Sequence, residues 1–116
     1  MQKNEVWRIS YRYDVSHIDG DDKMNDVYVV VAGNEEDALR KGDDCFSYSG
    51  LNRKLLEDGE ANCTDATLYN LRKNIKKYKE KVAFPKLSLA SDKEKFKLKA
   101  NISSDGRTRE FIVESK

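Results

Sequence analysis

The feature that most constrains the fold is a strict alternation of side-chain type over residues 6–15, VWRISYRYDV. Large apolar and aromatic side chains occupy every second position, and polar or charged side chains occupy the positions between them. Successive side chains of a β-strand point to opposite faces, so the pattern predicts a strand with one buried side. The side predicted to be buried consists of Trp7, Ile9, Tyr11, Tyr13 and Val15. The polar side consists of Arg8, Ser10, Arg12 and Asp14.

The next segment, VYVVVAG at residues 27–33, is apolar at consecutive positions. Such a run is typical of a central strand or of a strand that is covered on both faces. The residues between the two segments, SHIDGDDKMN at 16–25, are polar and rich in turn formers. We therefore predict an antiparallel hairpin of strands 6–15 and 27–33, joined by a long loop.

A helix is predicted directly after the second strand, over about residues 35–46. Asn34 is a favourable N-cap, and the acidic residues 35–37 complement the helix dipole in the first turn. A strand that runs through a glycine into a helix also raises the question of phosphate binding. Here three carboxylates occupy the position where a phosphate needs free N–H groups, and no GxGxxG or GxxxxGK[ST] motif is present. Gly33 and Asn34 are therefore interpreted as a strand-to-helix joint.

This hairpin, whose second strand runs into a helix that begins Glu-Glu-x-Ala, is similar in outline to the small archaeal ribosomal protein LX. The resemblance is confined to the N-terminal part of the chain, and the C-terminal third has no counterpart in that family. The similarity involves no functional residue, so no ligand or partner is transferred from it.

Residues 64–82, TDATLYNLRKNIKKYKEKV, permit two predictions. The first is a helix at about 65–81, because the apolar side chains follow a helical spacing and lysine and glutamate suit a helix. The side chains with this spacing are Leu68, Leu71, Ile75, Tyr78 and Val82. The second is a strand over 66–72, in which Thr67, Tyr69 and Leu71 alternate. We favour the helix.

The C-terminal part is predicted to be a meander of strands at 82–90, 95–102 and 108–115. The segment KFKLKANI alternates strictly between apolar and polar side chains, and SSDGR is a turn. Pro85 suits an edge strand, which can spare a backbone donor. A short helix is also expected within LNRKLLEDG at 51–59.

Together these elements predict an α+β fold in a single domain, residues 1–116. An antiparallel sheet of about four to five strands would be packed by helices at about 35–46 and 65–81. Charged residues make up 37% of the chain, hydrophobic residues 38%, and the mean hydropathy is −0.84. A small core under a heavily charged surface is expected from this composition.

The sequence predicts a cytoplasmic protein with no membrane span. The N-terminus lacks the apolar region of a secretory signal, and the longest apolar run is far shorter than the roughly 20 residues that a span requires. Cys45 and Cys63 have neither CxxC nor metal-ligand spacing, which fits a reducing compartment.

Catalytic and cofactor-binding signals are weak, so we expect no enzyme, no metal and no cofactor. His17 is the single histidine, and neither cysteine lies in a nucleophile motif. The aspartates of the 16–26 loop do not match an EF-hand, because a loop that starts at Asp14 places Gly20 one position too late. A small-ligand or metal site in this loop remains a third hypothesis.

The strongest functional signal is a basic segment. Residues 72–99 contain 11 basic and 3 acidic side chains, whereas residues 1–63 contain 14 acidic and 8 basic ones. The residues predicted to contact a partner are Lys73, Lys76, Lys77, Lys95, Lys97 and Lys99. A strand places alternate lysines about 6.5–7 Å apart, similar to the spacing of phosphates along a nucleic-acid strand.

Two functional classes follow from this charge pattern. We favour a small non-catalytic protein that acts through charged surfaces on a macromolecular partner, a protein or a nucleic-acid backbone; small, heavily charged chains of this kind are frequent in phages and mobile elements. The alternative is a nucleic-acid-binding module that contacts phosphates through residues 72–99. The two lysine rows must lie together if they are to form one patch, and neutralisation by the acidic half would leave only a solvated surface.

Overall fold

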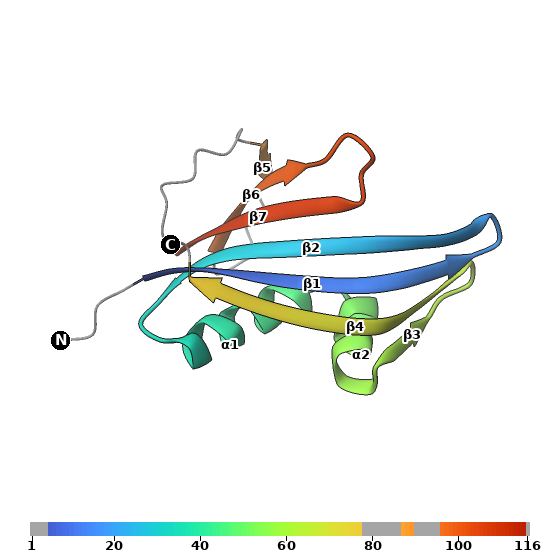
Figure 1. The fold of residues 1–116 in the computed structure, drawn as a ribbon, viewed down its shortest axis with the longest axis horizontal. Helices are drawn as coiled ribbons and strands as arrows, with labels where there is room; N and C mark the ends of the chain where they lie inside the picture. The colour runs from blue at the N-terminus through green and yellow to red at the C-terminus, as the bar shows by residue number, and fades with distance from the viewer. Residues whose placement is uncertain (1–4, 78–86, 90–95, 116) are drawn as a thin grey trace.

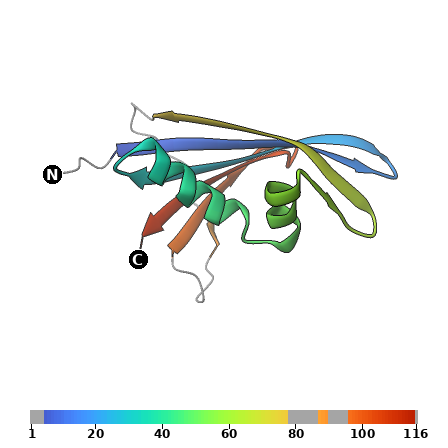
Figure 2. The same cartoon turned by 90° about the horizontal axis from the view of Figure 1, so that it is seen from below.

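The computed structural model describes residues 5–77, 87–89 and 96–115, which form one sheet with both helices on the same face (Figures 1 and 2). The strand order is β3-β4-β1-β2-β7-β6-β5; β2 and β7 are parallel and all other neighbours are antiparallel. The predicted α+β class is confirmed. The elements are β1 (Glu5–His17), β2 (Gly20–Ala32), α1 (Glu35–Phe46), α2 (Gly50–Asp58), β3 (Glu60–Asn62), β4 (Ala66–Lys77), β5 (Leu87–Leu89), β6 (Phe96–Ile102) and β7 (Thr108–Ser115).

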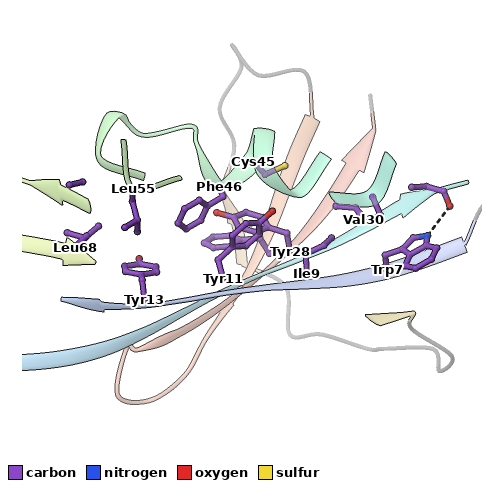
Figure 3. Packing of buried hydrophobic residues seen from close by; sticks show 14 residues of the cluster. Trp7, Ile9, Tyr11, Tyr13, Tyr28, Val30, Cys45, Phe46, Leu55 and Leu68 are labelled. Atoms are coloured by element: carbon purple, nitrogen blue, oxygen red, sulfur yellow. Dashed lines mark hydrogen bonds between the residues drawn. The ribbon is translucent and has the colours of Figure 1, made fainter. Parts of the chain in front are cut away.

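Strand β1 carries the core on the side that its alternation predicted. Its four aromatic and aliphatic side chains from Trp7 to Tyr13 are at most 7% exposed. Tyr11 stacks on Phe46 of α1 with ring centroids 4.5 Å apart, and Tyr28 of β2 stacks on Phe111 of β7 at 5.1 Å. The core therefore lies between β1 and the helices, as Figure 3 shows.

Helix α1 begins and ends as predicted. The Asn34 side chain caps it by accepting a hydrogen bond from the backbone N–H of Asp37 at 2.8 Å. Its buried residues include Gly42, which lies directly against the sheet: a Cβ atom there would be 2.6 Å from the Tyr11 hydroxyl. The glycine thus permits the close approach of α1 to β1. The expected short helix, α2, is also confirmed.

The β1–β2 hairpin is confirmed, but the predicted long loop at 16–26 is wrong. The strands continue to a two-residue turn, with His17 paired to Gly20. Gly20, the first residue after this turn, has a positive φ of 127°. The distal part of the hairpin extends beyond the helices (Figure 1), so its side chains are polar on both faces and carry no alternation that would reveal a strand.

The favoured helix at 65–81 is also wrong: residues 66–77 form strand β4, and the remainder of the predicted helix lies outside the described residues. The cause is a β-bulge. Arg12 pairs with Arg72 but Asp14 pairs with Tyr69, so one residue of β1 faces two of β4. This extra residue shifts the alternation of β4 by one position. Leu68, Leu71 and Ile75 therefore lie on the same side of one strand although they are spaced by three and four residues, as in a helix.

Asn70 supplies the backbone conformation at the bulge. Its φ of 60° is the only positive φ among the described non-glycine residues. Asparagine tolerates the left-handed region better than most residues. On either side of it, Leu68 is buried, and Leu71 and Ile75 pack against the same core.

The C-terminal strands form the predicted antiparallel meander, β5-β6-β7. Of the strand predicted at 82–90, the structure describes residues 87–89 alone, which form β5. The meander joins the hairpin through a parallel pairing of β7 with β2, so the predicted all-antiparallel sheet is corrected at this position. With β3 and β4 added, the sheet has seven strands where about four to five were expected.

An ion pair between a buried aspartate and a half-buried arginine stabilises this parallel contact. Arg109 of β7 donates two hydrogen bonds to Asp26 of β2, at 2.8 and 2.9 Å, and the Tyr13 hydroxyl donates a third at 3.0 Å. Asp26 is only 1% exposed. Burial lowers the pKa of Arg109, but the hydrogen bond and charge of Asp26 outweigh this effect, and the net shift is upward.

Replacing Gly42 with alanine tests the helix–sheet contact. The added methyl group meets the Tyr11 hydroxyl and Ile9, at 2.6 and 3.3 Å, so we expect a loss of about 1–3 kcal/mol in the free energy of unfolding. Gly50→Ala is the control, because nothing lies within 4 Å of its added atom and alanine favours a helix. Equal denaturation midpoints for the two variants would contradict this packing.

Two substitutions of Asn70 test the bulge. Both Asn70→Gly and Asn70→Val remove the hydrogen bond from the Asn70 side chain to Asp14, so their difference isolates the backbone. The free energy of unfolding should be about 1–2 kcal/mol lower for Asn70→Val than for Asn70→Gly, because a β-branched residue is strained at positive φ. Urea denaturation of both variants gives this difference, and a value near zero would argue against the left-handed residue.

Candidate partner-binding surface

The single histidine takes part in a polar cluster that fastens the hairpin tip. His17 Nε2 lies 2.8 Å from a carboxylate oxygen of Asp22, and its Nδ1 accepts the Asp19 backbone N–H. Arg107, in the turn before β7, donates to the other oxygen of Asp22 at 2.8 Å. The hydrogen bond from His17 and the charge of Arg107 lower the pKa of Asp22. The cluster joins two turns, and each of its groups has a structural role.

The acidic residues around the hairpin are held by arginines in separate pairs. Asp14 accepts from Arg72 at 3.1 Å, and Asp22 and Asp26 pair with arginines of the C-terminal part. Within residues 5–77, 87–89 and 96–115, no group of three or more His, Cys, Asp or Glu side chains is arranged to hold a metal ion. Residues 16–26 form a paired hairpin instead of the loop on which the hypothesis of a ligand site was built.

Two of the lysines predicted to contact a partner lie on the helix-covered face of the sheet, where carboxylates neutralise them. Lys73 pairs with Asp43 of α1 at 3.5 Å. Lys77 pairs with Glu5 at 2.9 Å, and its ammonium group lies 5.5 Å from the centroid of the Trp7 ring. The acidic N-terminal half thus meets part of the basic segment within the fold.

Lys76 differs from both of these lysines. It pairs in register with Arg8, whose position in the alternation of β1 lies opposite the core, so Lys76 occupies the face away from the helices. It is exposed and forms no ion pair within the described part of the chain. Of the predicted contact residues on β4, Lys76 is therefore the one that no described carboxylate neutralises.

The second predicted lysine row does not adjoin the first. Lys97 and Lys99 lie on β6, where their backbones pair with Glu114 and Ile112, and Lys95 lies outside the described residues. Strands β1, β2 and β7 separate β6 from β4. The register therefore places the two rows at separate positions along the sheet.

The pairing of β4 with β1 instead creates a different basic surface. We call it the cationic strip; it consists of Arg8, Arg12, Arg72 and Lys76, on the sheet face away from the helices. Arg8 is directly opposite Lys76, and Arg12 is directly opposite Arg72. Like charges in directly opposed positions destabilise a sheet, so this arrangement is not explained by stability.

Only half of the cationic strip is neutralised. Arg8 pairs with Glu110 at 3.0 Å, and Arg72 pairs with Asp14. Arg12 and Lys76 are exposed, and neither has an ion-pair partner among the residues that the structure describes. Two uncompensated cations remain at opposite ends of the strip, one on each strand.

The alternation over residues 6–15 already placed Arg8 and Arg12 on a common polar face. The predicted contact residues all came from the basic C-terminal segment, so Arg8 and Arg12 were not among them. Arg8 and Arg12 lie opposite Lys76 and Arg72 because β4 is a strand next to β1. A helix at residues 65–81, as predicted, would not pair with β1. The alternation of Thr67, Tyr69 and Leu71 indicated this strand, but the helical spacing of the apolar residues was favoured over it.

No family model matches the chain, and no curated protein or solved structure matches it either. The similarity in outline to ribosomal protein LX is therefore not supported by these comparisons. Among the described residues, no helix is long and apolar enough to cross a bilayer. A function must therefore be inferred from the positions and charges of the residues in the cationic strip.

Replacing Arg12 with threonine should stabilise the protein. The substitution removes the repulsion between Arg12 and Arg72, so we expect a gain of about 0.2–1 kcal/mol at low ionic strength that shrinks as salt is added. Arg8→Thr is the matched control, because it removes both the repulsion with Lys76 and the ion pair with Glu110, so it should stabilise less than Arg12→Thr. Thermal melts at two salt concentrations separate the charge effect from the preference of threonine for strands.

Proposed function

We propose that the protein is a non-catalytic binding protein whose cationic strip receives an acidic surface of a partner protein. One observation carries this proposal: two strands place like charges directly opposite each other, and two of the four cations lack a carboxylate in the described structure. A partner that supplies carboxylates to Arg12 and Lys76 would relieve this repulsion. Electrostatic complementarity of this kind directs association and selects partners.

The charge balance favours a protein partner over a nucleic acid. The net charge is +1 and the isoelectric point is about 7.7, whereas nucleic-acid-binding domains commonly exceed 9. Asp14 and Glu110 lie within the strip and would repel a continuous row of phosphates. The aromatic side chains of β1 are buried on the other face, so they cannot stack on bases.

A site-specific photocrosslinker tests the proposal. Asn74 lies on β4 between Arg72 and Lys76 and is exposed, so a benzophenone side chain at this position should capture the partner in cell extract. The same group at Arg53 of α2, which is exposed on the helical side, is the control. The captured protein should be acidic at the contact, and the Arg12→Glu, Lys76→Glu variant should bind it at least about tenfold more weakly.

Two outcomes would contradict the proposal. One is identical capture from positions 74 and 53, which would mean that the strip is not the contact. The other is a shift of single-stranded oligonucleotides whose affinity falls steeply with salt and is lost in the same double variant, which would assign the strip to nucleic acid.

A further inference from the structure

Among the residues that the structure describes, the outer edge of β4 is unpaired over most of its length. On this side, β3 pairs only with Thr67, Leu68 and Tyr69. Beyond the bulge, Arg72–Lys77 pair with β1 on the inner side, and no strand of the described chain pairs with them on the outer side. Figure 1 shows β4 continuing along the sheet margin past the end of β3. A row of backbone donors and acceptors therefore faces outward.

Free edges of this kind are templates for another strand, and proteins normally blunt them. Common devices are a very short strand, a proline, or a bulge within the edge. The segment 72–77 has no proline, and its bulge lies before it at Asn70, so the segment itself is regular. The blunting device that remains is charge.

The charges of this edge are cationic on both faces of the sheet. Arg72 and Lys76 lie on the face of the cationic strip, and Lys73 and Lys77 lie on the helix-covered face. The side chains of Arg72 and Lys77 remain 49% and 52% exposed despite their ion pairs. An added strand would lie about 4.8 Å away, with its side chains directly beside these cations.

The cations on this edge favour some added strands over others. A second copy that pairs antiparallel along the full segment would place Arg72 opposite Lys77 and Lys73 opposite Lys76, which is repulsive. An extended segment that carries Asp or Glu at alternate positions would instead place carboxylates beside the cations on one face. Backbone hydrogen bonds would give affinity, and the charges would give selectivity.

We propose that β4 binds an extended acidic segment of a partner protein as an additional strand of the sheet, paired with residues 72–77. This inference rests on the proposed function and specifies its partner: the acidic surface is, at least in part, a linear segment in β-conformation. The cationic strip then lies beside the added strand on the same sheet face. The segment supplies carboxylates to Lys76 and to the exposed cations of the edge.

Synthetic peptides test strand addition on the intact protein. The probe is a peptide of about six to eight residues that alternates Glu and Val, which is the length of a typical strand. Two further versions carry N-methyl groups on alternate amides, one at the Glu positions and one at the Val positions. Backbone pairing requires one alternate set of amides, so one methylated version should bind at least tenfold more weakly while the other binds like the parent.

Amide hydrogen exchange gives a second readout. Alternate amides of residues 72–77 should exchange rapidly in the free protein and become protected when the Glu–Val peptide binds. A Lys–Val peptide of the same length should protect none of them. The Arg12→Glu, Lys76→Glu variant should weaken binding of the Glu–Val peptide.

The outcomes separate this inference from the proposed function. Equal binding of both methylated peptides, or no binding of the parent peptide while position 74 still captures an acidic partner, overturns strand addition alone. Protection of the edge amides that rises with protein concentration without peptide assigns the edge to a second copy and also overturns it. Failure of both the peptide and the crosslink overturns the proposed function as well.

Discussion

The contact between Tyr11 and helix α1 is the interaction on which the rest of the structure depends. The ring stacks on Phe46, the hydroxyl donates to Asp43 at 2.7 Å, and Gly42 provides the space for both. Burial and the adjacent carboxylate raise the pKa of Tyr11, so the hydroxyl stays protonated and keeps donating. Because this contact commits one face of β1 to the core, the alternate residues must lie on the other face, where they form half of the cationic strip.

The bulge at Asn70 connects the core to the proposed binding edge. It keeps Leu68 and Ile75 on the same core side of the sheet although their positions differ by seven, an odd number. Strand β3 accompanies β4 only before the bulge. A single residue in the left-handed conformation therefore both preserves the apolar side of β4 and marks where its outer edge becomes free.

Some cations of the basic segment form ion pairs, and others have no carboxylate partner among the described residues. Carboxylates from the N-terminal half pair with Arg72, Lys73 and Lys77, so the acidic and basic parts of the chain meet within the fold. The parallel β2–β7 contact is likewise stabilised by the ion pair of Asp26 with Arg109. Lys76 and Arg12 are left over by this pairing, and they carry the argument for a partner.

The sequence by itself determined the elements whose side chains follow one regular period. The buried face of β1, the capped helix α1 and the alternating strand β6 all have uninterrupted patterns, and all were predicted. The protruding hairpin end and strand β4 were missed, because the first has no buried face and the second contains a bulge that breaks the period. Only the tertiary structure decided which strands are neighbours, and hence that Arg8 and Arg12 of the N-terminal strand face Lys76 and Arg72. The pairing of strands distant in sequence depends on shared burial and on backbone register, and local periodicity records neither.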